Sequence, residues 1–223
     1  MNSYHIIDVS QWMDDFIFPG NPAFSLTGPF NRVSGSNPEF VYDFTSCSQS
    51  GTHIQGPHYF LESGAKIDAF PIDTFEGNAI VVDLNKRGVD TTAVDFRDLL
   101  QGSDTSASIL IMRTGNMDEI IRTGRVDDSN CPGISLDAAR YLVEECQFKM
   151  LAIDSIGFES RVTKNYEVNV YLCSQGILLL EGLVNLAAIS HQNVFLEAFP
   201  LKLRGVEGTP CRAIVKEMIE NPS

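Results

Sequence analysis

Histidine and cysteine, the residues from which most zinc sites are built, are scarce in this sequence. There are four histidines, His5, His53, His58 and His191, and five scattered cysteines with no CxxC pair. An odd number of dispersed cysteines argues against a disulfide framework and against a zinc knuckle. Any metal site rich in histidine would have to draw on these four residues.

Positive charge is also in short supply. The chain carries 16 Lys and Arg against 29 Asp and Glu, a net charge of −13, which argues against nucleic acid and anionic membranes as partners. Residues 1–25 show no signal-peptide pattern, and the longest apolar stretch, near Gly176–Leu180, is far shorter than the roughly 20 residues of a membrane span. We therefore expect a soluble, cytoplasmic protein.

Short, β-branched apolar runs dominate what the chain does contain. They predict strands over residues 4–9, 79–84, 108–113, 150–154 and 193–203. Two helices are also expected: Thr92 can cap one that runs to about Leu100, and Ser135 can cap another. Because no repeat, linker or low-complexity tract interrupts the pattern, residues 1–223 are interpreted as a single mixed α/β domain.

Residues 10–38 differ from the rest, since several prolines and glycines alternate there with aromatic side chains such as Trp12 and Phe24. A long loop of this composition is typical of a lid or a partner-contacting arm. The alternative is that its aromatic residues simply fill the edge of the core.

Polar, chemically capable side chains concentrate in residues 47–60. Gln49, His53, Gln55 and Tyr59 all occupy odd positions, so an extended backbone would direct them towards one side. The pattern indicates a polar pocket wall with one imidazole, two amides and a phenol. The alternative for His53 is a purely structural hydrogen bond near a turn.

This stretch resembles the signature of the cyclase family, which includes kynurenine formamidases and isatin hydrolases, and whose motif reads His-x-Gly-Thr-His-x-Asp-x-Pro-x-His. Gly51-Thr52-His53 and Pro57 match it. Further segments fall in the family's order: Ile7-Asp8-Val9-Ser10, Phe18-Pro19-Gly20-Asn21, Met112-Arg113-Thr114-Gly115, Pro132-Gly133-Ile134-Ser135, Ile153-Asp154-Ser155, Glu181-Gly182-Leu183-Val184-Asn185-Leu186, Pro200-Leu201-Lys202-Leu203 and Gly208-Thr209-Pro210-Cys211-Arg212-Ala213. The resemblance implies a β-barrel-like core with flanking helices, assembled as a homodimer or homotetramer.

The resemblance also implies an activity, namely amide or lactam hydrolysis or ring closure, supported by one or two divalent metals such as Zn²⁺ or Mn²⁺. Such a metal lowers the pKa of a bound water and polarises a carbonyl. The last histidine of the motif would move protons.

The departures from the family pattern fall on the residues that would hold the metal. Of the metal positions implied by the resemblance, His53 and Glu181 are retained, whereas the others are Gln49, Gln55 and Asn169. Neutral amides are poor ligands for a divalent transition metal. The position of the catalytic histidine is Tyr59.

Other nearby residues offer little to replace the lost ligands. His58 is one residue out of phase with the motif. Cys47 is the best substitute ligand, so a metal, if bound, would use His53, Glu181 and Cys47. The expectation is that no cofactor is bound.

Three functions remain open at this point. The first is a cyclase-family enzyme acting on a polyketide-like or other carbonyl-bearing substrate by metal-independent ring closure, elimination or isomerisation. The second is a non-catalytic small-molecule binder, and the third is a metal-dependent hydrolase of the kynurenine formamidase type. For the first, His53, Tyr59 and Glu181 are the candidate catalytic residues. The candidate substrate-binding residues are Gln49, Gln55, Asn169, Phe24 and Trp12.

Two aspartates and two arginines are given structural roles. Asp8 and Asp154 end apolar strands, where an orienting role is an alternative, and Arg113 and Arg212 are expected to form ion pairs within the chain.

Overall fold

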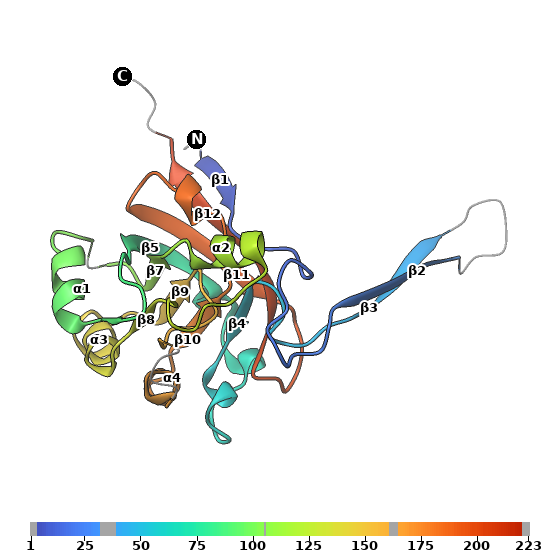
Figure 1. Cartoon of the computed structure of the whole chain (residues 1–223), viewed down its shortest axis with the longest axis horizontal. Coiled ribbons are helices and arrows are strands. Elements are labelled where there is room, and N and C mark those ends of the chain that lie inside the picture. The colour runs from blue at the N-terminus through green and yellow to red at the C-terminus, as the bar shows by residue number, and fades with distance from the viewer. Residues whose placement is uncertain (1–3, 32–38, 105, 161–164, 220–223) are drawn as a thin grey trace.

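The computed structural model describes residues 4–31, 39–104, 106–160 and 165–219. Within these residues, seven strands close into a barrel in the order β12-β11-β5-β7-β9-β10-β4, because β4 also pairs with β12 (Figure 1). The strands are β4 (His53–Gln55), β5 (Glu76–Asp83), β7 (Ile109–Arg113), β9 (Met150–Ile153), β10 (Leu178–Glu181), β11 (Asn193–Pro200) and β12 (Gly208–Met218). An additional strand, β1 (Tyr4–Asp8), pairs with β12 outside the closed ring.

The parallel strands β5, β7, β9 and β10 are buried on both faces, which explains their continuous apolar sequences. On β7, Ile109 and Ile111 belong to one hydrophobic cluster, with Met150 and Ala152 of β9. The alternate residue Leu110 belongs to a second cluster, which also contains side chains from the helices. The barrel therefore has an inner core and a helix-covered outer face.

The helices contribute to this second cluster and begin where the sequence predicts. Thr92 and Asp95 form a capping box at the start of α1 (Ala93–Leu99). The Ser135 hydroxyl accepts a hydrogen bond from the Ala138 amide at the start of α3 (Leu136–Arg140). The remaining elements are α2 (Asn116–Thr123), α4 (Glu167–Ser174), a π-helical turn (Tyr141–Glu145), the short pair β6 (Asp90–Thr91) and β8 (Gly133–Ile134), and 3₁₀ turns at Pro57–Tyr59, Ile67–Ala69, Ile72–Phe75 and Leu186–Ala188.

The five predicted strands correspond to β1, β5, β7, β9 and β11, and the expected mixed α/β barrel is confirmed. Both arginines form the expected ion pairs, Arg113 with Asp83 and Arg212 with Asp8. In the part of the chain that the structure describes, every helix is too short or too polar to span a lipid bilayer.

A β-hairpin projects from the barrel as an arm, formed by β2 (Ser25–Asn31) and β3 (Phe40–Thr45) (Figure 1). Residues 10–38 are expected to form a loop or an arm; within them, residues 25–31 form strand β2 of this arm, and residues 32–38 lie outside the described part. A register shift between Thr27 and Phe30 accommodates Gly28-Pro29, the dipeptide that made this strand read as a loop. The arm exposes Leu26, Phe30, Phe40, Tyr42 and Phe44.

The assembly of this chain into a homodimer or homotetramer stays a prediction.

Candidate functional site

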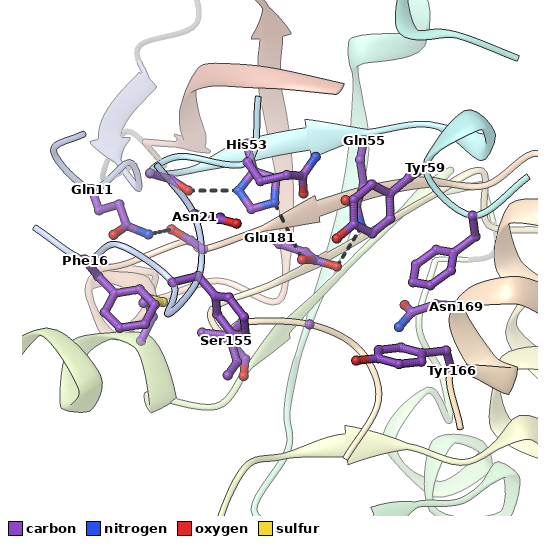
Figure 2. A pocket seen from close by; sticks show the side chains of 18 residues that line it. Gln11, Phe16, Asn21, His53, Gln55, Tyr59, Ser155, Tyr166, Asn169 and Glu181 are labelled. Atoms are coloured by element: carbon purple, nitrogen blue, oxygen red, sulfur yellow. Dashed lines mark hydrogen bonds and ion pairs between the residues drawn. The ribbon is translucent and has the colours of Figure 1, made fainter. Parts of the chain in front are cut away.

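A cleft of about 840 Å³, its open mouth included, lies beside β4 and β10. Figure 2 shows His53, Gln55 and Glu181 close together, with the ring of Tyr59 beside them. The lining combines amides, aromatic rings and a single carboxylate: Gln11, Phe16, Phe18, Asn21, Gln49, Gly51, His53, Gln55, Tyr59, Phe60, Met117, Ser155, Ile156, Gly157, Tyr166, Asn169, Glu181 and Gly182.

His53 is held in one orientation by the turn that precedes it. It begins β4 and pairs in register with Glu181 of β10. Its Nδ1 lies 2.9 Å from the carbonyl oxygen of Gly51. Because a carbonyl oxygen only accepts, Nδ1 carries a hydrogen, which leaves Nε2 as the ring nitrogen that can take up or release a proton. Nε2 is buried without a hydrogen-bond partner in the described residues, 3.6 Å from Glu181 Oε2.

Glu181 connects His53 to Gln55. Its Oε1 accepts a hydrogen bond of 3.0 Å from Gln55 Nε2, while its Oε2 faces the imidazole of His53. Gln55 is 1% exposed, and its carbonyl oxygen Oε1 is buried with no partner among the described residues. The carboxylate is thus oriented by an amide and available to stabilise a positive charge on the imidazole.

Tyr59 ends a 3₁₀ turn and packs edge-on against Phe60, with ring centroids 4.8 Å apart. Burial, followed by the negative charges of Glu181 and Glu207, raises the pKa of the Tyr59 phenol. The phenol therefore keeps its proton at neutral pH and can donate a hydrogen bond.

The other two amides predicted from the sequence also line the cleft, each tied to a carboxylate. Gln49 Nε2 donates to Glu207 Oε1 over 3.2 Å. Asn169, on α4, donates through Nδ2 to Glu159 Oε2 over 2.9 Å, and its Oδ1 is buried without a partner within the described chain. Burial raises the pKa of Glu159.

The structure brings together His53, Tyr59, Glu181, Gln49, Gln55 and Asn169, but not three other predicted residues. Trp12 is 76% exposed, and Phe24 packs against Phe44 of the arm with ring centroids 6.5 Å apart. Neither lines the cleft, so the expectation that they contact substrate there differs from the structure.

Cys47, the proposed substitute metal ligand, is also outside the cleft. Its sulfur lies 3.3 Å from the hydroxyl of Ser50, because residues 47–50 form a turn and do not extend β4. The alternation argument therefore fails at Cys47. His58 is likewise not a lining residue, as its phase predicts.

Sequence reasoning missed the side chains that the loop after β1 places over the end of β4. The backbone amide of Gln11 donates to Thr52 Oγ1 over 3.0 Å, and its side chain donates to the carbonyl of Gly182 over 2.9 Å. Phe16, Phe18 and Asn21 continue this wall. Their place in the loop gave no signal that distinguished them from Trp12.

Comparison with known proteins identifies the family. A family model described as "Putative cyclase" matches residues 7–160. The chain belongs to this family. It is 28% identical to kynurenine formamidase from Geobacillus thermodenitrificans over 95% of this chain and 97% of that protein. It is 26% identical to Cyclase-like protein 1 from Arabidopsis thaliana over 74% of this chain, and the match spans only 65% of that relative's length.

A solved structure shares the same fold. Isatin hydrolase A from Labrenzia aggregata superposes with a TM-score of 0.83, at 18% identity, over 97% of this chain and 94% of that chain. The chain is therefore related to kynurenine formamidases and shares its architecture with isatin hydrolase.

The residues of this chain do not fit a transition-metal site of the kind that its family resemblance implies. Among the described residues, no group of three or more His, Cys, Asp or Glu side chains is placed to hold a metal ion. At the cleft, His53 and Glu181 supply one nitrogen and one carboxylate, and the neighbouring Gln55 offers a neutral amide. Tetrahedral zinc in proteins takes at least three such strong ligands.

Asp154 holds the loop that carries Ser155, Ile156 and Gly157 along the cleft. Its carboxylate accepts hydrogen bonds from the amides of Thr114 (2.6 Å) and Gly115 (2.7 Å) and from the Thr114 hydroxyl (2.7 Å). Burial raises its pKa to about 6, although these bonds favour the ionised form, so it is mostly ionised at pH 7. The structural role expected for Asp154 agrees with these contacts.

Asp154→Asn is expected to lower the free energy of unfolding at pH 7 by about 2–3 kcal/mol, because the amide group cannot accept all three hydrogen bonds. Urea denaturation followed by circular dichroism measures the change. The matched substitution at the exposed Asp14, Asp14→Asn, should change stability by less than about 0.5 kcal/mol. Equal stability of the two variants would show that the loop does not depend on this carboxylate.

Proposed function

We propose that this chain is an enzyme that rearranges a carbonyl-bearing small molecule by metal-independent acid/base chemistry, with His53 as the base. The observation that carries the proposal is the unpartnered Nε2 of His53, buried in the cleft with its tautomer fixed by Gly51. A nitrogen lone pair held in this way is prepared to accept a proton from a bound substrate.

Glu181 has a defined part in this proposal. When Nε2 takes a proton, the imidazolium gains an ion pair with Glu181 Oε2, 3.6 Å away. The hydrogen bond from Gln55 Nε2 keeps the carboxylate facing His53. The negative charge therefore stabilises the protonated base in a site with little solvent.

Tyr59 is assigned the complementary role of hydrogen-bond donor. Its phenol stays protonated at neutral pH because burial and the charges of Glu181 and Glu207 raise its pKa. A neutral phenol beside the acid/base pair can stabilise negative charge on a substrate oxygen, such as that of an enolate, and can return a proton. Proton removal at His53 and oxygen stabilisation at Tyr59 together support isomerisation, elimination or ring closure.

The mass of the product tests this reaction class. Purified protein is incubated with enolisable β-ketoesters, an aryl formamide and isatin, and the products are identified by mass spectrometry. We expect an enolisable substrate to be converted to a product of unchanged mass, or to one that has lost water. Isatin opened with the gain of one water, or the aryl formamide cleaved to formate and an arylamine, would support the metal-dependent hydrolase alternative. Binding without any product would support the non-catalytic alternative.

Tyr59→Phe is expected to lower kcat about 10²-fold, since it removes one donor to the developing negative charge while keeping the ring. The measurement is steady-state turnover of the substrate found above. Tyr42→Phe is the matched control, because Tyr42 lies on the exposed arm. If both variants retain full turnover, Tyr59 serves only as part of the cleft wall.

A further inference from the structure

In three amide side chains that line the cleft, the NH₂ group donates a hydrogen bond to an acceptor within the chain. Gln11 Nε2 donates to the carbonyl of Gly182, Gln55 Nε2 to Glu181, and Asn169 Nδ2 to Glu159. Backbone carbonyls and ionised carboxylates accept hydrogen bonds and cannot donate them, so the orientation of each amide is determined by its partner. The oxygen of each amide is therefore the group that can still accept a hydrogen bond.

These three oxygens have no partner within the described chain. Gln11 Oε1, Gln55 Oε1 and Asn169 Oδ1 are buried and unpaired, and their residues are 9%, 1% and 7% exposed. Buried polar groups in folded proteins almost always have partners, so three unpaired amide oxygens around one cleft indicate that a ligand supplies the donors.

The charge and the aromatic content of the cleft indicate the sign of that ligand. Glu181 is a lining carboxylate, whereas none of the described lining residues is Lys or Arg. The rings of Phe16, Phe18, Tyr59, Phe60 and Tyr166 form much of the remaining wall. A carboxylate and aromatic faces together favour a cation over an anion or a neutral molecule.

We propose that the ligand of this cleft carries a protonated amine or amidine whose N–H groups donate to the unpaired acceptors. This inference rests on the proposed function for the carbonyl part of the molecule, so the substrate class becomes a carbonyl compound that also bears an organic cation. Gln55 and Asn169, which stand where the family resemblance implies metal ligands, then bind the ligand. Each contributes a hydrogen-bond acceptor where a metal would need a carboxylate or an imidazole.

Calorimetric titration with four probes tests the inference without any need for turnover. The probes are benzylammonium, N,N,N-trimethylbenzylammonium, benzyl alcohol and benzoate, each titrated into the full chain. We expect benzylammonium to bind at least about tenfold more tightly than the other three. The trimethyl compound keeps the charge and the ring but has no N–H donor, so it separates hydrogen bonding from cation–π attraction.

Glu181→Gln should weaken benzylammonium binding about tenfold, because it removes the charge and keeps the shape and the hydrogen-bond acceptor. Glu62→Gln, at an exposed position outside the cleft, should leave it unchanged. The probe series on the unaltered chain gives a result even if Glu181→Gln folds poorly.

Three outcomes would overturn the inference: benzoate binding as tightly as benzylammonium, the trimethyl compound binding as tightly, or Ca²⁺ displacing benzylammonium at one ion per chain. The proposed function fails separately. If benzylammonium binds but none of the carbonyl compounds is converted, the proposed enzyme activity is contradicted and the ligand class stands. If only anionic carbonyl compounds are converted, the ligand class is contradicted and the proposed enzyme activity stands.

Discussion

Replacing His53 by glutamine is expected to lower kcat/KM about 10²–10⁴-fold, the range that a positioned general base contributes. Glutamine has a similar reach and can still donate a hydrogen bond to the carbonyl of Gly51, but it cannot take up a proton. The fold should tolerate the change, because Nε2 has no partner to lose among the described residues. Steady-state turnover and thermal unfolding, measured on the same preparation, check both expectations.

The matched control is His5→Gln, which removes an exposed imidazole on β1 outside the cleft. It should retain the turnover of the unaltered chain. If His53→Gln retains it as well, His53 is a structural hydrogen-bond donor to Gly51, which is the alternative that the sequence leaves open, and the acid/base proposal fails.

Restoring the metal ligands that the family resemblance implies is expected to change the affinity for Zn²⁺ by a larger factor than any single substitution in the cleft. The variant Gln49→His/Gln55→Asp/Asn169→His replaces three amides that line the same cleft as His53 and Glu181. We expect Zn²⁺ to bind this variant at least about 10³-fold more tightly than the unaltered chain, because imidazole and carboxylate ligands replace neutral amides. Competition with a chromogenic zinc chelator measures both affinities.

A control variant changes the same three positions without supplying strong ligands: Gln49→Asn/Gln55→Asn/Asn169→Gln. Its zinc affinity should match that of the unaltered chain. If the unaltered chain binds zinc as tightly as the restored variant, the amides are not what limits metal binding, and the interpretation of this cleft as unsuited to zinc is wrong.

Four of the seven barrel strands, β5, β7, β9 and β11, could be predicted from their apolar sequences. Runs such as Ile109–Arg113 and Met150–Ile153 are almost entirely buried and favour strands in a covered sheet. The closed barrel is implied only by the family resemblance, and the sequence pattern does not predict β4, β10 or β12. The arm could not be predicted in the same way. Its strand β2 contains Gly28-Pro29 and lies in a projecting hairpin, so neither composition nor burial indicates a strand.

His53 and Gln55 could be predicted to share the cleft, because they lie two residues apart on β4. Glu181 follows only from the family resemblance, and the pairing of β10 with β4 brings it beside His53. Gln11 could not be found, since its place depends on contacts with Thr52 and Gly182, distant in sequence. Trp12 was chosen for its aromatic ring, although the loop turns that side chain to the surface.

Turnover by metal-depleted protein tests the central claim most directly. Protein is dialysed against a strong chelator and assayed on its substrate, and its metal content is measured in the same sample. The account predicts that kcat stays within about twofold of the untreated value and does not rise when Zn²⁺ or Mn²⁺ is added, because His53, Tyr59 and Glu181 perform the proton transfers. Loss of turnover on chelation, restored by one equivalent of either metal, would contradict it.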